Sequence, residues 1–204
     1  YSEAANQIAK LHLLFESAKV EQGDKIALIG RNTPNWTITY IAVVTYGAVI
    51  VPILQDFNPN DVHHIVNHSE SKMLFCSDKI WDTLEEEKMN NLIAVFSLND
   101  FRCIHQKDGE YIQKIMNSLT DNFNKRYPQG YKQEHVKYAE RDNAELAMIS
   151  YTSGTTGFSK GVMISGNALA GNITFGIRTQ LLQRGDKVLA FLPLAHAYGM
   201  AFDF

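Results

Sequence analysis

The chain has few of the residues that mark several common classes of protein. It is 204 residues long and holds only two cysteines, Cys76 and Cys103. Because these lie at no metal-binding spacing and cannot form a disulfide framework, they are typical of a reducing compartment, and we expect a cytoplasmic location. The net charge of −3 gives no argument for nucleic acid or an anionic membrane as a partner, and no nucleic-acid binding is expected.

Long uninterrupted apolar segments are also scarce. No charged residue occurs from 32 to 55, and residues 38–54 are largely apolar. A membrane-spanning helix needs about 20 apolar residues, whereas Gly47 and Pro52 interrupt this run. A buried helix over 34–46 followed by a buried strand over 49–53 accounts for it better. We therefore expect no transmembrane segment, which leaves peripheral membrane association open.

With 45% hydrophobic residues, the chain can bury a sizeable core. Amphipathic segments alternate with short apolar ones, which predicts an α/β fold in which a parallel sheet is flanked by helices on both faces. A polar stretch over 120–145 is interpreted as a connecting excursion. The predicted helices are 2–20, 34–46, 58–67, 78–88 and 167–181, and the predicted strands are 25–29, 49–53, 72–76, 92–96, 146–151, 160–164 and 187–192.

One segment differs from the rest in its chemistry. Residues 152–157 are all threonine, serine or glycine, Lys160 follows, and an apolar run lies on each side. Small residues let backbone N–H groups approach an anion, while hydroxyls and a lysine add donors and charge. Such composition ordinarily means a surface turn, but a turn needs neither the lysine nor two flanking strands. The segment therefore predicts a phosphate-binding loop.

The spacing excludes a Walker-type loop, which requires a second glycine before the lysine and a hydroxyl after it. Ser159 and Gly161 occupy those positions. The segment 151–162 resembles instead the phosphate-binding signature of the adenylate-forming (AMP-binding) enzymes, Tyr-Thr-Ser-Gly-Thr-Thr-Gly-x-Pro-Lys-Gly-Val. The one difference is Ser159 in place of proline, which changes loop stiffness because proline fixes φ, and leaves the donors in place.

Three further segments resemble the same superfamily in the same order. They are 23–27 with 32–36, then 46–52, then 192–199, which reads Leu-Pro-Leu-Ala-His-Ala-Tyr-Gly. The last is similar to the Pro-Leu-x-His-x-x-Gly segment of long-chain fatty-acid-CoA ligases (acyl-CoA synthetases). The resemblance implies that residues 1–204 are a partial N-terminal AMP-binding domain, with the C-terminal domain absent and little activity on its own.

The resemblance implies an acid–thiol ligase whose small-molecule substrates are a fatty acid, ATP and coenzyme A. Such an enzyme joins the acid to ATP, giving acyl-AMP and pyrophosphate, and then transfers the acyl group to coenzyme A. The loop would hold the β- and γ-phosphates, and Thr155 would also help to ligate Mg2+. The residues implied for nucleotide binding are Thr152, Ser153, Gly154, Thr155, Thr156, Gly157 and Lys160; those implied for substrate binding are His196, Tyr198 and Gly199, with His196 also as the catalytic residue.

Two other interpretations stay open. An amino-acid or aryl-acid adenylating enzyme would carry the same loop, and Phe202-Asp203-Phe204 faintly resembles the Phe-Asp-x-Ser-type segment of peptide-synthetase adenylation domains. That segment follows the histidine motif, however, and so comes too late in the chain. The other interpretation is a non-catalytic nucleotide-binding module that has kept the loop and lost the chemistry.

The segment 196–202 favours a fatty acid over an amino acid. It offers small and apolar side chains, and no carboxylate occurs before Asp203. An amino-acid pocket needs an acid to pair with the ammonium, whereas an alkyl chain gains about 0.8 kcal/mol for each buried methylene. We therefore expect a medium- to long-chain fatty acid as the substrate.

Three histidines occur close together in the predicted helix 58–67 and just after it. His64 and His68 share a helix face at a spacing that zinc ligands use, but no third ligand stands at a plausible spacing. His63, His64 and His68 are therefore interpreted as ordinary histidines on a helix surface.

Overall fold

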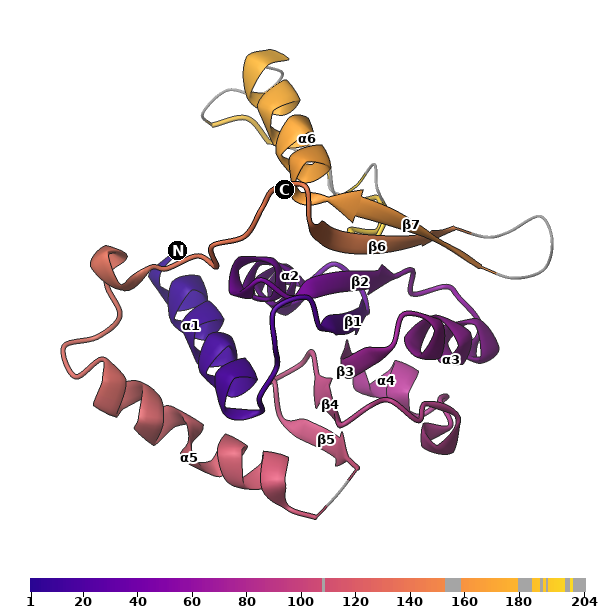
Figure 1. Cartoon of the computed structure of the whole chain (residues 1–204), viewed down its shortest axis with the longest axis horizontal. Helices are drawn as coiled ribbons and strands as arrows, with labels where there is room; N and C mark the ends of the chain where they lie inside the picture. The colour runs from indigo at the N-terminus through magenta and orange to yellow at the C-terminus, as the bar shows by residue number, and fades with distance from the viewer. Residues whose placement is uncertain are drawn as a thin grey trace.

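A computed structural model gives the fold and describes residues 1–107, 109–152, 159–179, 185–187, 189, 191–196 and 199. Its described part is built on one seven-stranded sheet with helices on both faces (Figure 1). The strands are β1 (Lys25–Ile29), β2 (Val49–Ile53), β3 (Ser71–Cys76), β4 (Ala94–Ser97), β5 (Cys103–Gln106), β6 (Leu146–Thr152) and β7 (Lys160–Ser165). The helices are α1 (Ser2–Ser17), α2 (Pro34–Tyr46), α3 (Pro59–His68), α4 (Asp78–Trp81), α5 (Tyr111–Arg126) and α6 (Gly166–Thr179), with 3-10 turns η1 (Glu86–Lys88) and η2 (Gln133–His135).

The strand order across the sheet is β5-β4-β3-β1-β2-β6-β7. The five central strands are parallel, which confirms the predicted α/β fold, while β5 and β7 pair antiparallel with β4 and β6. Each of these two edge strands follows its partner after a short connection. A short connection can join only antiparallel strands, because parallel strands need a crossover of a dozen or more residues.

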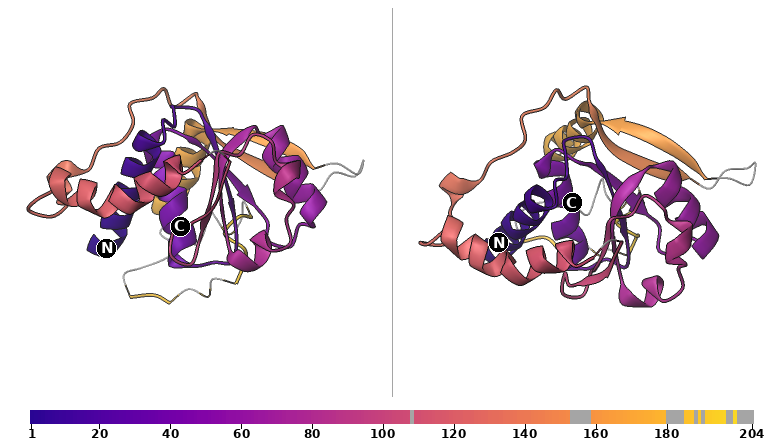
Figure 2. Two further views of the ribbon diagram at one scale, coloured as in Figure 1. Left: turned by 90° about the horizontal axis from the view of Figure 1, so that it is seen from below. Right: turned by 60° about the horizontal axis from the view of Figure 1, so that its bottom comes forward.

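Helices cover both faces of the sheet (Figure 2), and successive residues of the central strands belong to two different cores, one on each face. In β1, Ile26 and Leu28 pack with α1, α2 and α5, whereas Ala27 and Ile29 pack with α3. Strand side chains alternate between faces, so a strand buried on both faces is apolar throughout. This is why the central strands could be recognised as continuous apolar runs.

Helix α2 begins where the sequence predicts. Thr33 lies in the extended region, and its hydroxyl accepts the Trp36 N–H at 3.2 Å, while Pro34 takes the first helical position. The helix ends at Tyr46 and is capped by Gly47, whose φ of 91° is a left-handed conformation that favours glycine. Both the helix over 34–46 and the strand over 49–53 are confirmed.

The predicted helix over 78–88 is wrong for most of its length. Only α4 is helical, and η1 forms a single turn after a break. Helix α3 binds this part of the chain instead: the Glu85 N–H donates to His63, and the Lys88 carbonyl accepts from Asn67. Tertiary contacts therefore override the local helical pattern.

The predicted excursion over 120–145 begins inside a helix. Helix α5 extends to Arg126 and buries one apolar stripe against the core that contains α1. The Arg126 guanidinium donates to the Glu16 carboxylate at 2.6 Å, and the Tyr111 hydroxyl donates to the Ser17 carbonyl at 2.6 Å. The residues of the stripe are Ile112, Ile115, Leu119 and Phe123.

Other predicted boundaries shift by a few residues. The first helix ends at Ser17 rather than 20, the strand over 92–96 lies over Ala94–Ser97, and the helix over 167–181 is α6, followed as far as Thr179. The predicted last strand, 187–192, is not found among its described residues. Leu189 and Phe191 are 82% and 75% exposed, so these two side chains are not packed against the sheet.

Candidate functional site

Strands β6 and β7 form a hairpin whose connection is the predicted phosphate loop. Thr152 ends β6, Lys160 begins β7, and the two residues are paired across the ladder. Both side chains are exposed. The hairpin therefore places the two ends of the loop side by side. The other residues predicted to bind nucleotide or metal lie outside the described residues: Ser153, Gly154, Thr155, Thr156 and Gly157.

Thr152 and Lys160 point to the same face of the sheet, because residues paired across an antiparallel ladder share a face. Met148 lies four residues before Thr152, so it shares this face, and it belongs to the core formed with α1 and α2. One hydroxyl and one ammonium thus stand together at the base of the loop, on the side of the sheet that carries α2. Both are groups that bind phosphate oxygens.

Tyr151 anchors the same hairpin on the opposite face. Its side chain is buried, packs in the core that contains α3, and its hydroxyl lies 2.7 Å from Nδ1 of His68. Burial raises the pKa of Tyr151. Gly161, its partner in the ladder, leaves room for the ring, since a Cβ there would lie 3.1 Å from Cζ of Tyr151.

The histidine segment is held against the loop that follows β1. The side-chain amide of Asn32 donates to the Leu192 carbonyl at 2.8 Å and accepts from the Leu194 N–H at 2.9 Å. Leu194 is buried in the core that contains α2, whereas the predicted catalytic residue His196 is exposed. The His196 N–H donates to the Pro193 carbonyl at 2.9 Å and closes a turn.

Gly199, predicted to bind substrate, is buried in a place that has no room for a side chain. A Cβ there would lie 2.5 Å from the carbonyl oxygen of Pro193. The glycine therefore permits close packing against the turn that precedes it. Tyr198, the other predicted substrate residue, lies outside the described residues.

The hairpin and the histidine segment lie at one edge of the sheet. Strands β1, β2 and β6 are parallel neighbours, so their carboxyl ends share an edge. Asn32 comes three residues after β1, and Thr152 closes β6. Neighbouring strands are about 4.8 Å apart, which separates β1 from β6 by about 10 Å. Ligands of open α/β sheets bind outside this edge, and the fold brings both predicted parts of the site to it.

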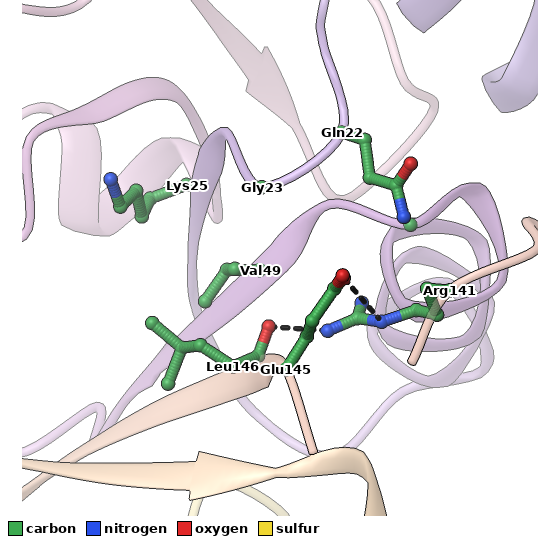
Figure 3. A pocket seen from close by; sticks show the side chains of 8 residues that line it. Gln22, Gly23, Lys25, Val49, Arg141, Glu145 and Leu146 are labelled. Carbon is green, nitrogen blue, oxygen red and sulfur yellow. Dashed lines mark hydrogen bonds and ion pairs between the residues drawn. The ribbon is translucent and has the colours of Figure 1, made fainter. Parts of the chain in front are cut away.

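A pocket of about 360 Å³ lies where β1, β2 and β6 begin, at the end of these strands opposite to the predicted loop (Figure 3). Arg141 donates through Nη2 to the Leu146 carbonyl, and its Nε lies 3.9 Å from the Glu145 carboxylate. Because β1, β2 and β6 begin here, the pocket is separate from the predicted nucleotide site, and the polar stretch before β6 gave no sequence signal for it. Its lining residues are Gln22, Gly23, Lys25, Gly47, Val49, Arg141, Glu145 and Leu146.

The prediction that His63 lies on a helix surface is wrong. The residue is only 4% exposed, because Nε2 accepts the Glu85 N–H at 3.0 Å and so holds the ring against the chain after α4. His68 contacts Tyr151 as described above. Within the described stretches of the chain, no three histidine, cysteine, aspartate or glutamate side chains gather as metal ligands would. None of the described helices is long and apolar enough to cross a membrane.

The family of the chain follows from a match over its full length. Residues 1–204 match the family model described as AMP-binding enzyme. The chain therefore belongs to the AMP-binding enzyme family, as its motifs predicted.

Curated relatives of the chain are long-chain acyl-CoA synthetases. It is 29% identical over 207 residues to the peroxisomal long chain acyl-CoA synthetase 7 of Arabidopsis thaliana, covering 98% of this chain and 28% of the relative. It is also 29% identical over 205 residues to the long-chain-fatty-acid–CoA ligase FadD15 of Mycobacterium tuberculosis, covering 99% and 32%. The chain thus spans about a third of the length of these relatives.

Solved structures of acyl-CoA ligases share the fold. A long-chain-fatty-acid-CoA ligase (FadD1) of Archaeoglobus fulgidus superposes with a TM-score of 0.72 at 22% identity, covering 98% of this chain and 36% of that one. An anthranilate CoA ligase, AuaEII, in complex with anthranoyl-AMP gives 0.74 at 16% identity, covering 97% and 35%. At such identities the likeness establishes the fold alone.

Proposed function

We propose that the full-length protein is an ATP-dependent fatty-acid–CoA ligase, which forms an acyl adenylate and then an acyl-CoA thioester. The observation that carries the proposal is the pairing of Thr152 with Lys160 at the carboxyl edge of the sheet. The segment of His196 lies at the same edge and packs on the same face. Membership of the AMP-binding enzyme family supports the reaction class.

In the first step a carboxylate oxygen of the acid attacks the α-phosphorus of ATP. The bond from that phosphorus to the bridging oxygen breaks, and pyrophosphate leaves with the electron pair. Lys160 and the hydroxyl-rich run 152–157 would hold the β- and γ-phosphates and stabilise the negative charge that grows on the leaving group. In the second step the sulfur of coenzyme A attacks the acyl carbon, AMP leaves, and the thiol proton is lost.

Thr155 is the residue we assign to Mg2+, which when bound neutralises phosphate charge. The donor set between 152 and 160 fits this arrangement, because it holds hydroxyls and one ammonium and no carboxylate. Such a set suits phosphate oxygens, and Mg2+ commonly takes further ligands from the phosphates and from water.

His196 is assigned to the carboxylate of the acid, with Tyr198 and Gly199 beside the acyl chain. Two observations support a long-chain fatty acid as the substrate. The relatives named above are long-chain synthetases at 29% identity, and the segment 197–202 contains no charge. An uncharged, largely apolar sequence suits an alkyl chain and offers no partner for an ammonium.

The test measures pyrophosphate release and thioester formation by the full-length protein with acetate, decanoate, palmitate, coumarate and the common amino acids. We expect kcat/KM to rise with chain length. Preference for coumarate or an amino acid would support adenylation but refute a fatty acid as the substrate. ATP binding without pyrophosphate release would point to a non-catalytic module. Residues 1–204 alone are expected to form no acyl-CoA, because phosphate contacts by themselves leave most of the nucleotide in water.

A further inference from the structure

Asn32 connects the loop after the first strand to the histidine segment, which follows 160 residues later in the chain. We propose that Asn32 is a positioning residue for His196 in the ligase reaction, an inference that rests on the proposed function. Its Nδ2 donates to the Leu192 carbonyl, and its Oδ1 accepts from the Leu194 N–H. One side chain thus holds the segment at two points, two and four residues before His196.

The two hydrogen bonds give the backbone of this segment the partners that a neighbouring strand would otherwise supply. Pro193 has no N–H and so contributes no backbone donor at this point of the segment. Asn32 bonds the backbone on each side of this proline, and the Pro193 carbonyl accepts the His196 N–H at 2.9 Å. The turn that carries His196 is therefore built directly on the groups that Asn32 holds.

The anchor itself is fixed. Asn32 lies between β1, which is fully buried from Ile26 to Ile29, and the first turn of α2. The Thr33 cap and Pro34 fix the backbone at the start of that helix. The backbone at Asn32 therefore has little freedom to move. Its side chain fixes the position of the histidine segment through the two hydrogen bonds.

The orientation of the amide is determined by its partners. The Leu192 carbonyl can only accept and the Leu194 N–H can only donate, so the reverse orientation would lose both bonds. An aspartate would still accept from Leu194 but would place its second oxygen against the Leu192 carbonyl. Asn32→Asp therefore tests the hydrogen bond to the Leu192 carbonyl at nearly constant side-chain volume, and Asn32→Ala tests the loss of both hydrogen bonds.

The exposed ring of His196 depends on this support. The chain is buried at Leu194 and Ala195 and leaves the core at His196. If the two bonds are lost, the turn can shift on its buried residues, and a displacement of about 1 Å in a reacting group can cost about 100-fold in rate. Since His196 is assigned to the acid, the loss should appear with the acid and not with ATP.

Asn35 is a matched control from the same part of the chain. Its Nδ2 donates to the Leu98 and Asn99 carbonyls at 2.8 and 3.1 Å, so Asn35→Ala also removes two bonds from a side-chain amide to a distant backbone. Those bonds do not involve the histidine segment. Asn35→Ala reports the general effect of such a loss on stability.

The experiment uses the full-length protein and measures KM for palmitate, KM for ATP and kcat in acyl-adenylate formation. We expect Asn32→Ala to lower kcat/KM for palmitate by about tenfold, the cost of two ordinary hydrogen bonds, with KM for ATP nearly unchanged. Asn32→Asp should also lower kcat/KM for palmitate, because it replaces the bond to the Leu192 carbonyl with two opposed oxygens. Asn35→Ala should stay within about twofold of wild type. In a His196→Ala background, Asn32→Ala should have little further effect.

Hydrogen exchange gives a measurement independent of activity. The Leu194 amide should exchange about tenfold faster in Asn32→Ala than in wild type or Asn35→Ala, because it loses its acceptor. Equal kinetic losses in the Asn32 and Asn35 variants, or full additivity with His196→Ala, would overturn the role of Asn32 in an active enzyme. A wild-type protein that forms no acyl adenylate from any acid would overturn the proposed function instead, while the exchange data would still report the contact.

Discussion

The Tyr151 hydroxyl lies 2.7 Å from Nδ1 of His68 and joins the strand that enters the predicted phosphate loop to helix α3. The two rings meet nearly edge to face, with centroids 5.8 Å apart. A phenol is protonated at neutral pH, and burial raises the pKa of Tyr151 further, so its hydroxyl can donate to the imidazole. The hairpin is thus anchored on one face of the sheet, and it presents Thr152 and Lys160 on the other.

Tyr151→Phe keeps the ring and removes this hydrogen bond. We expect the free energy of unfolding to fall by about 1 kcal/mol, the usual cost of a lost buried hydrogen bond. Urea unfolding of the purified protein measures it, and His68→Ala in both backgrounds completes a double-mutant cycle. If His68→Ala costs the same with Tyr151 as with phenylalanine, the two side chains are not coupled and the anchor is refuted.

Gly161→Ala should strain the base of the same hairpin. The added Cβ would lie 3.0 Å from Cγ2 of Ile149 and 3.1 Å from Cζ of Tyr151. Forcing a methyl group into a packed site costs about 1–3 kcal/mol, so the melting temperature should drop. Gly171→Ala is the control, because its Cβ meets nothing within 4 Å in the exposed helix α6, and alanine there should stabilise by up to about 1 kcal/mol. Equal melting temperatures for the two variants would contradict the packing argument.

Features with local signals could be predicted from the sequence. Thr33 and Pro34 mark a helix start by their own chemistry, and the apolar run 49–53 marks a strand buried on both faces. Strand β5 has no such signal, because its residues are only half-buried and it is recognised only by pairing with β4. The amphipathic spacing of α5 was present in the sequence, but its polar neighbours favoured a loop.

In the candidate site, too, only the features with local signals could be predicted from the sequence. The loop and its lysine could be predicted from composition, whereas the pairing of Thr152 with Lys160 at its base is seen only in the register of β6 and β7. The contact of Asn32 with Leu192 spans 160 residues, and that of His68 with Tyr151 spans 83. No periodicity reaches across such separations, so only the folded chain reveals which residues hold the site in place.

Lys160→Ala should weaken the use of ATP by the full-length protein. The lost charge-assisted contact to phosphate is worth about 1.5–3 kcal/mol, roughly 10- to 150-fold in kcat/KM for ATP. ATP–pyrophosphate exchange measures the effect, and Lys160→Arg should retain much of the activity. Lys125→Ala removes an exposed lysine from α5, far along the chain from the loop, and should leave KM for ATP unchanged. An unaltered exchange rate in Lys160→Ala would remove this residue from the site.

The free energy of unfolding should decrease as the pH falls below about 6.5, the ordinary pKa of histidine. Nε2 of His63 accepts the Glu85 N–H, which only the neutral ring can do. Burial lowers the pKa of His63, the charge of Lys88 lowers it further, and Glu85 opposes them. The unfolded chain therefore takes up this proton at a higher pH than the folded chain, so the stability present above that pH is lost as the pH drops through the folded-state pKa.

His63→Gln removes this titration and keeps a side-chain acceptor, so its free energy of unfolding should vary less between pH 7.5 and 5.5. Part of the slope will persist, because burial also lowers the pKa of His12, whose ring contacts the Ala42 carbonyl. In the double variant His12→Gln, His63→Gln, the free energy of unfolding should vary less with pH than in either single variant. Urea unfolding at several pH values gives the comparison, and parallel curves for wild type and His63→Gln would show that the buried imidazole does not control the acid sensitivity.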